Sequence, residues 1–261
     1  MGLGFSGEVA ELYQRYRRGY PAAVVDVLVD AFGLGRDDVV VDIGCGTGQL
    51  TLPVARRVRV AIGMDPEPDM LARARQVCLE AGQTNLCWQL GADTDVPALR
   101  TLVGDRAVGA VTIGQALHWM DHEALFGAAA PLIRRGGGVA IVTNGAPLWL
   151  QEAEWSRALR GVLEQWLGRP LTYPCGTDAA SQQRYAASLA AAGFTVSQHA
   201  VEYTDQIDLD HVLGGVYSAF SAAQLPAPDQ RQVLADRVRQ ALHPHDRVTE
   251  HVRVALLLGT I

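Results

Sequence analysis

The stretch Val39-Val40-Val41-Asp42-Ile43-Gly44-Cys45-Gly46-Thr47-Gly48 joins an apolar, β-branched run to three glycines at alternate positions. This pattern predicts a buried parallel strand, a tight turn and then a helix, which we expect from Gln49 to about Val58. Glycine has no side chain, so a turn of this kind lets the backbone approach a ligand closely. The sequence therefore predicts a ligand site at the tip of this strand.

A dinucleotide is the common ligand of such a turn, through the pattern G-x-G-x-x-G. Counted from Gly44, the sixth position here is Gln49 and not glycine. Asp42 also lies two residues before the first glycine. A pyrophosphate at a helix N-terminus is repelled by a nearby carboxylate, because both are negative. The carboxylate therefore favours a ligand that carries positive charge.

The pattern Asp-x-Gly-x-Gly-x-Gly resembles motif I of the class I methyltransferases that depend on S-adenosylmethionine (SAM), a cofactor with a sulfonium, an ammonium and no phosphate. The run from Tyr13 to Pro21 is similar to the Y-x-x-x-R-P-x-Y-P signature that precedes motif I in one subgroup, with Arg18 in place of its first proline. Residues 115–121 resemble the A-x-A-F-H-W segment of the type 11 subgroup, which includes enzymes similar to trans-aconitate methyltransferase.

Apolar runs at 59–65, 85–93, 107–115 and 139–143 predict further strands that alternate with helices, as in an open, doubly wound α/β fold. The resemblance implies a Rossmann-like class I methyltransferase fold: a seven-stranded, mostly parallel sheet in the order 3-2-1-4-5-7-6. Its last two strands are expected at 194–203 and 249–258. We interpret residues 1–261 as a single methyltransferase domain, with an N-terminal lid helix at about 8–32 and cap insertions at about 147–185 and 205–245.

The ends of the predicted strands supply candidate cofactor contacts. Asp65 ends the second strand, where a carboxylate can accept hydrogen bonds from ribose hydroxyls, although it could instead cap the next helix. In the family an acid after the third strand accepts from the adenine amino group; Asp93 holds that place, and Asp95 is the alternative. The resemblance implies that SAM contacts Tyr13, Arg17, Asp42, Gly44, Cys45, Gly46, Gln49, Asp65, Pro66, Met70, Ala92, Asp93, Thr94 and Gln115.

His118 follows the fourth predicted strand, whose carboxyl end borders the transferable methyl group in this family. It is our first candidate for a general base, should the methyl acceptor need to lose a proton, and Tyr20 is the second. The alternative is that His118 only packs against or orients its neighbours. His118 and His122 have the spacing of a metal-binding pair, but no glutamate lies between them as in the zinc-protease motif, so we expect no metal.

The composition and the absent motifs limit which class of molecule can be the methyl acceptor. The formal net charge is −6, and the Asn/Asp-Pro-Pro-Tyr/Phe motif of adenine and amide methylation is absent. Both observations argue against nucleic acid and favour a small-molecule acceptor, because nucleic-acid binding needs a basic surface. Five aromatic residues are candidates for an apolar acceptor pocket, and the alternative for each of them is that it packs in the core: Trp149, Trp155, Trp166, Tyr173 and Tyr217. A SAM-fold protein that catalyses a cyclisation and a nucleotide-dependent oxidoreductase are the rival functions.

The remaining expectations concern location and assembly. The four cysteines form no C-x-x-C pair, no run of 18 apolar residues occurs, and residues 1–10 lack the pattern of a signal peptide. We therefore expect a reduced, cytoplasmic protein with no membrane partner. We expect it to be a monomer or a homodimer.

Overall fold

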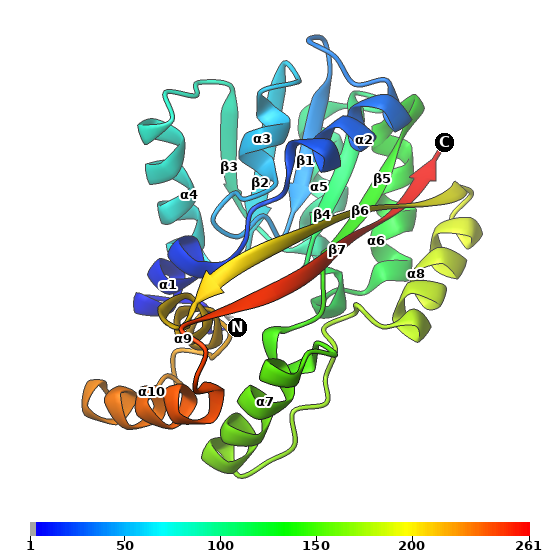
Figure 1. Cartoon of the computed structure of the whole chain (residues 1–261). Helices are drawn as coiled ribbons and strands as arrows, with labels where there is room; N and C mark the ends of the chain where they lie inside the picture. The colour runs from blue at the N-terminus through cyan, green and yellow to red at the C-terminus, as the bar shows by residue number, and fades with distance from the viewer. Residues whose placement is uncertain (1–3) are drawn as a thin grey trace.

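Seven strands form one sheet in the computed structural model, which describes residues 4–261. The strands are β1 (Val39–Ile43), β2 (Val60–Asp65), β3 (Leu86–Leu90), β4 (Val108–Gly114), β5 (Ile133–Asn144), β6 (Thr195–Asp208) and β7 (Arg247–Thr260). Their order is β3-β2-β1-β4-β5-β7-β6, with β1 to β5 parallel and β7 antiparallel to both neighbours (Figure 1). The predicted fold class and strand order are confirmed. The first three residues of the stretch 1–10, which was judged against a signal-peptide pattern, lie outside the described residues.

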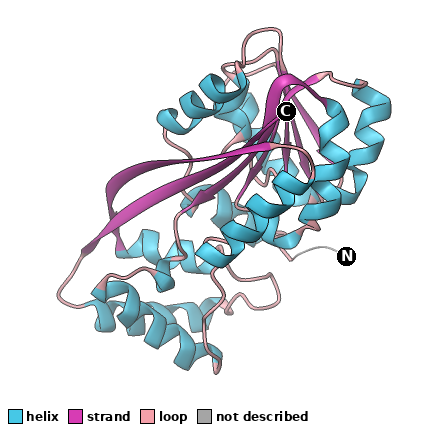
Figure 2. Ribbon diagram, turned by 90° about the vertical axis from the view of Figure 1, so that its right-hand side faces the viewer, coloured by secondary structure: helices cyan, strands magenta, loops and turns pink. Residues whose placement is uncertain are grey.

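Helices cover both faces of the sheet (Figure 2). They are α1 (Glu8–Tyr16), α2 (Ala22–Phe32), α3 (Thr51–Ala55), α4 (Pro68–Glu80), α5 (Val96–Val103), α6 (His122–Ala129), α7 (Glu154–Leu167), α8 (Ala179–Ala191), α9 (Leu209–Tyr217) and α10 (Pro228–Leu242). Side chains of β1 alternate between the two faces: Val40 packs with α2 and α3, whereas Val41 and Ile43 pack with α5, α6 and α8. Both faces are buried, which explains why the parallel strands are continuous apolar runs.

A third apolar core lies away from the sheet, among α7, α9, α10 and the outer ends of β6 and β7. The two strands pair from Thr195 opposite Thr260 to Asp208 opposite Arg247, so they form a long ribbon that reaches these helices (Figure 1). The indole N–H of Trp155 donates to the carbonyl of Thr249 at 3.0 Å and fastens α7 to the ribbon. We call α7, α9 and α10 the cap.

The N-terminal helix α1 joins the sheet to the cap. On one side, the N–H of Gly7 donates to Asp69 of α4 at 2.6 Å. On the other side, the ring of Tyr16 lies directly on Gly214 of α9, and the two helices run side by side (Figure 1). After Tyr16 the backbone becomes extended at Arg17, so the residues that follow cross from the cap back to the sheet.

Several predicted boundaries were wrong. α6 ends at Ala129 and is followed by a 3-10 turn that contains Pro131, because proline has no N–H to continue a helix. Arg134 and Arg135 belong to β5. The helix expected from Gln49 to Val58 is α-helical only over Thr51–Ala55, α5 was not expected, and β6 and β7 are longer than predicted.

Membrane crossing was tested on the described residues only. None of the helices within residues 4–261 combines the length and the apolar character needed to cross a bilayer.

The contact between α1 and α9 predicts how one methyl group added at Gly214 changes the free energy of unfolding. A Cβ added at Gly214 would lie 2.2 Å from Cγ of Tyr16, so Gly214→Ala forces the helices apart and should lower the free energy of unfolding by about 1–3 kcal/mol. In α7, Gly161 has no atom within 4 Å of an added Cβ. Gly161→Ala should therefore raise the free energy of unfolding by roughly 0.5–1 kcal/mol. Urea unfolding measures both; equal stability of the two variants would contradict the contact.

Candidate active site

A cavity of about 370 Å³ lies at the carboxyl ends of β1, β2 and β4, between the sheet, α1 and the cap. This volume falls in the range of roughly 300–1,000 Å³ that is usual for small-molecule sites. The predicted residues that line it are Tyr13, Arg17, Tyr20, Asp42, Gly44, Cys45, Gly46, Gln49, Asp65, Pro66, Met70, Ala92, Asp93, Gln115 and His118. Thr94 is the one predicted residue that does not line it.

The glycine loop after β1 is fixed against β2. The N–H groups of Gly44 and Cys45 both donate to the carbonyl of Met64, at 2.8 and 3.1 Å. Gly44 has a φ of 66°, and an added Cβ would lie 2.5 Å from Cβ of Ala116 in the loop after β4. Only glycine fits this backbone and this packing. The turn therefore presents bare backbone to the cavity.

Asp42 lies at the base of this loop and is 2% exposed. Its carboxylate accepts hydrogen bonds from the hydroxyls of Thr51 at 2.5 Å and Thr112 at 2.7 Å. The pKa of Asp42 is raised to about 6, chiefly by burial and to a smaller extent by the nearby Asp65. The hydrogen bonds from the two threonines oppose this rise. Two neutral donors thus leave the negative charge incompletely compensated, and a cation in the cavity would stabilise it.

Asp65 ends β2 and is 7% exposed. Its two oxygens accept from the N–H of Gly46 at 2.8 Å and the N–H of Glu67 at 2.9 Å. Burial raises the pKa of this carboxyl, while the two backbone hydrogen bonds lower it. The N-cap of the following helix is Glu67, so Asp65 does not cap it. Each oxygen keeps a second lone pair, which a ribose hydroxyl could use.

The two acids after β3 have different surroundings. Asp93 lines the cavity, and its Oδ2 accepts from the N–H of Asp121 at 3.3 Å. Asp95 does not line the cavity, because its Oδ2 is turned back to accept from the N–H of Ala92 at 2.8 Å. Of the two alternatives, the structure places Asp93 at the cavity wall.

The extended segment after α1 carries a cation to the cavity. The guanidinium of Arg17 lies 5.2 Å from the ring centroid of Tyr13, which in turn lies over Gly46 of the glycine loop. Within residues 4–261, no carboxylate forms an ion pair with Arg17, and its Nε is buried without a hydrogen-bond partner. The cavity therefore offers an anionic group a cation that is not already paired.

Tyr20 and His118 differ sharply as candidate bases. Burial raises the pKa of Tyr20 well above 10, so its hydroxyl stays protonated at neutral pH. Burial and, to a smaller extent, the positive charge of Arg17 together lower the pKa of His118 to about 4. The imidazole is therefore neutral and able to accept a proton. Its ring lies 5.1 Å from the ring of Trp119 and 6.1 Å from that of Tyr173.

The cap side of the cavity contains residues that were not predicted. Asn144 lies at the carboxyl end of β5, where the position of the other strand ends could have indicated it. Arg18, Leu148, Ile207 and Glu250 also line the cavity, and they come from four separate segments. No local pattern marks these four, because their place depends on how the cap folds back over the sheet.

The predicted aromatic pocket was mostly wrong. Only Trp149 of the five residues lines the cavity. Trp155 and Tyr217 are buried in the apolar core of the cap, and Trp166 packs against that core. Tyr173 is 59% exposed. Amphipathic helices of the cap need these side chains for their own packing, which the sequence pattern does not distinguish from a ligand pocket.

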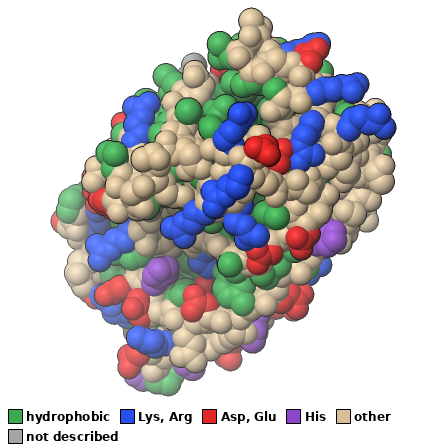
Figure 3. All heavy atoms as spheres, turned by 90° about the horizontal axis from the view of Figure 1, so that it is seen from above, with side chains coloured by type: hydrophobic (Ala, Val, Ile, Leu, Met, Phe, Trp, Pro, Cys, Tyr) green, Lys and Arg blue, Asp and Glu red, His purple; other side chains and the backbone are tan. Residues whose placement is uncertain are grey.

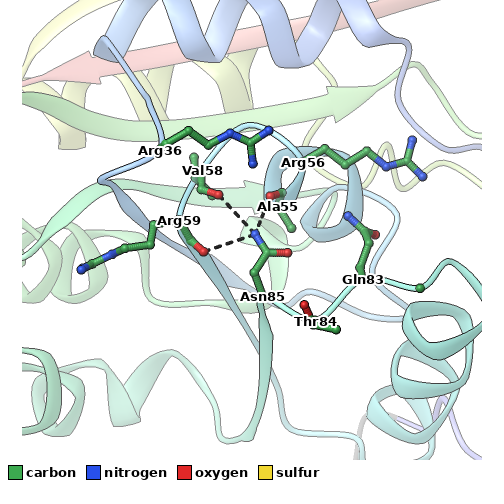
Figure 4. A pocket seen from close by; sticks show the side chains of 9 residues that line it. Arg36, Ala55, Arg56, Val58, Arg59, Gln83, Thr84 and Asn85 are labelled. Atoms are coloured by element: carbon green, nitrogen blue, oxygen red, sulfur yellow. Dashed lines mark hydrogen bonds between the residues drawn. The ribbon is translucent and has the colours of Figure 1, made fainter.

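A second, open hollow of about 530 Å³ lies at the opposite, amino-terminal end of the strands. Arginine side chains are visible across this end of the molecule (Figure 3), and Arg36, Arg56 and Arg59 border the hollow (Figure 4). The side-chain amide of Asn85 donates to three carbonyls there, those of Ala55, Val58 and Arg59, and so fixes the loop before β2. None of the predicted site residues lies in this hollow.

Metal ligation was considered for the same described residues. Within residues 4–261, no three His, Cys, Asp or Glu side chains are grouped as a metal site.

Comparisons with known proteins agree with this geometry. Residues 40–137 match the model of a family described as "Methyltransferase domain". An uncharacterized methyltransferase of Mycobacterium tuberculosis is 28% identical over 261 residues, which cover 100% of this chain and 94% of that protein. Trans-aconitate 2-methyltransferase of Mycobacterium ulcerans is 30% identical over 184 residues, or 69% of this chain and 65% of that protein.

A solved structure assigned as a type II methyltransferase from Anaeromyxobacter dehalogenans has the same fold, with a TM-score of 0.59 and 20% identity over 94% of this chain and 96% of that one. The matched family region contains β1 to the start of β5, and hence the glycine loop and the acids that follow β2 and β3. The chain therefore carries, over residues 40–137, a region similar to the methyltransferase domain family, and its relatives of similar sequence are methyltransferases.

Proposed function

We propose that the protein transfers the methyl group of SAM to a small-molecule acceptor. The observation that carries this proposal is a pair of buried carboxylates, Asp42 and Asp65, beside a glycine loop whose backbone faces the cavity. A cofactor with a pyrophosphate would be repelled there, whereas a nucleoside with a sulfonium and an ammonium would be attracted.

The residues at the cavity fit SAM from end to end. Asp65 has lone pairs for the ribose hydroxyls, and Asp93 can accept from the adenine amino group. Arg17 is the cation that can pair with the methionine carboxylate. Buried polar atoms without partners lie on lining residues, namely Nε of Arg17, Nε2 of Gln49 and Oε1 of Gln115. Such atoms are costly unless a ligand satisfies them, so they support a polar ligand of mixed character.

When bound, SAM supplies a methyl group that its sulfonium has already activated. The chain's own contribution is then to hold the acceptor in line and to exclude water. His118 is neutral because of its low pKa and can take a proton from the acceptor. Tyr20 stays protonated and can donate a hydrogen bond, which makes it a positioning group rather than a base.

Two further observations favour a small molecule as the methyl acceptor. The net charge of −6 disfavours nucleic acid, and the trans-aconitate relative is named for a small-molecule substrate. We place the protein in the cytoplasm as a monomer or homodimer, with its four cysteines as free thiols. We treat residues 1–261 as one domain in which α1 is a lid and the cap encloses the acceptor.

Calorimetry tests the cofactor. The protein should bind S-adenosylhomocysteine (SAH) and neither NADH nor NADPH. Asp65→Ala should weaken SAH binding by about 1–3 kcal/mol, because charged hydrogen bonds to the ribose are lost. Asp105→Ala is the matched control, since Asp105 is exposed and pairs only with Arg100. Heat with NADH and none with SAH would overturn the proposal.

A pH titration tests the neighbourhood of His118. Its pKa is lowered to about 4, partly by Arg17, so removing that charge should raise the pKa toward 6.5. NMR of the imidazole Cε1–H should show this shift in Arg17→Gln. The control is Arg15→Gln, which changes an exposed arginine two residues earlier. A wild-type His118 that titrates near 6.5 would contradict the buried, cation-facing position.

The raised pKa of Asp42 predicts that replacing this residue stabilises the fold but weakens cofactor binding. Its pKa rises from 3.8 to about 6 on folding, so its contribution to stability is present below the unfolded pKa and is lost as pH rises through 6. Asn resembles the protonated form. Asp42→Asn should therefore raise the free energy of unfolding at pH 8 by about 3 kcal/mol at most.

The gain should shrink toward about pH 4, where wild-type Asp42 is itself protonated in the folded state. SAH binding should weaken at pH 8, since a negative charge near the cofactor is removed. Urea unfolding and calorimetry at both pH values measure the two effects. A variant that is less stable at pH 8 and binds SAH normally would contradict the role of the buried charge.

A further inference from the structure

A buried ion pair lies at the cap end of the cavity. Nη2 of Arg18, in the extended segment after α1, is 3.3 Å from Oε1 of Glu250 on β7. Glu250 is 1% exposed, and its Oε1 also accepts from Nε2 of Gln151 at 2.7 Å. Arg18 and Glu250 both line the cavity. Arg18 also stands where the similar family signature has proline.

Apolar side chains line the cavity near the ion pair. Leu148, Trp149 and Ile207 line the same end of the cavity. An ion pair in such a place gives little net stability, because removing both charges from water costs about as much as their attraction returns. Hydrophobic residues of similar volume would serve as well for folding alone. This argues that the charges are kept for a ligand.

Three polar atoms at this end have no partner. Nη1 of Arg18 and Oδ1 of Asn144 are buried without a hydrogen bond. Within the described chain, Oε2 of Glu250 accepts no hydrogen bond, since both Gln151 and Arg18 contact Oε1. Nδ2 of Asn144 donates to the carbonyl of Gly19 at 3.1 Å and to that of Arg18 at 3.5 Å, which ties Asn144 to the segment that carries Arg18. One donor and two acceptors are thus gathered on neighbouring residues.

The charges at this end balance. Arg18 is neutralised by Glu250. Arg17 is the other cation nearby, and the proposed function, on which this step rests, pairs it with the methionine carboxylate. With cofactor bound, no charge remains for the acceptor to compensate. An acceptor with a carboxylate or an ammonium group would have to bury an unpaired charge, which is costly.

We propose that Arg18 and Glu250 together recognise an uncharged polar group of the methyl acceptor, one that both accepts and donates hydrogen bonds, such as a carboxamide or a hydroxyl. The group accepts from Nη1 of Arg18 and donates to Oε2 of Glu250 or Oδ1 of Asn144. The rest of the acceptor packs on the apolar wall. The acceptor class is therefore a neutral, amphipathic small molecule.

Charge selectivity distinguishes recognition from a purely structural pair that only fastens the lid to the ribbon. Three probes of similar size that differ in charge are titrated against the SAH-loaded protein at neutral pH by NMR: benzamide, benzoate and benzylammonium. Saturation with SAH keeps the probes out of the cofactor end. The wild type should bind benzamide roughly tenfold more tightly than either ion, a typical effect for one partly desolvated charge.

Two variants should change this preference in opposite directions. Glu250→Gln leaves the positive charge of Arg18 unpaired, so the preference should move by roughly tenfold toward benzoate. Arg18→Gln leaves the negative charge of Glu250 unpaired, so the preference should move toward benzylammonium. The matched control is Glu202→Gln, because Glu202 pairs with Arg253 at 3.2 Å on the exposed surface of the same ribbon. It should leave the preference unchanged.

The outcomes separate the two proposals. If SAH does not bind, the proposed function fails, and the acceptor class fails with it. If SAH binds but benzamide does not, or if benzoate binds the wild type as well as benzamide, only the acceptor class is overturned. The acceptor class is also overturned if Glu250→Gln and Arg18→Gln still bind SAH, which shows that they are folded, and still prefer benzamide as the wild type does.

Discussion

The hydrogen bond from the N–H of Gly46 to Asp65 holds the tips of β1 and β2 together. The carbonyl of Met64 adds two more backbone bonds to the same loop. This joint fixes where the backbone is bare and where the two buried carboxylates lie. Asp42 and Asp65 are both buried beside this loop, and Asp65 contributes to the raised pKa of Asp42. These hydrogen bonds therefore place the two carboxylates at the sheet side of the cavity and make that side negative.

The opposite side of the cavity is positive. Arg17 approaches from the extended segment after α1, which the cap holds in place through Tyr16 and Gly214, whereas the neighbouring Arg18 is neutralised by Glu250. The cavity is therefore polar along one axis, with carboxylates at the sheet and the unpaired guanidinium of Arg17 at the lid. This arrangement keeps His118 neutral, since both burial and the adjacent cation oppose its protonation. A zwitterionic cofactor can lie along the axis with each charge facing its opposite.

Sequence reasoning succeeded where geometry follows directly from strand order. Parallel strands end at one edge of a sheet, so residues just after β1, β2 and β4 must meet, and Asp42, Asp65 and His118 do line one cavity. Their positions were predicted in this way, while their roles stay predictions.

The cap side was beyond such reasoning. Arg18 and Glu250 lie near opposite ends of the chain, and they meet only because β7 turns back beside β5 and extends past it. Trp155 and Tyr217 were assigned to a pocket because an amphipathic helix presents the same pattern whether its apolar face packs on a ligand or on another helix.

The long ribbon of β6 and β7 has a consequence for how such proteins diverge. The region shared with the methyltransferase family, residues 40–137, builds the floor of the cavity, whereas Arg18, Asn144, Ile207 and Glu250 all lie outside it. Substitutions accumulating on the ribbon and the cap can remodel one end of the cavity while the other end is inherited unaltered. Descendants of one ancestral gene could then acquire new metabolic roles through a few changes in sequence that never touch the shared half.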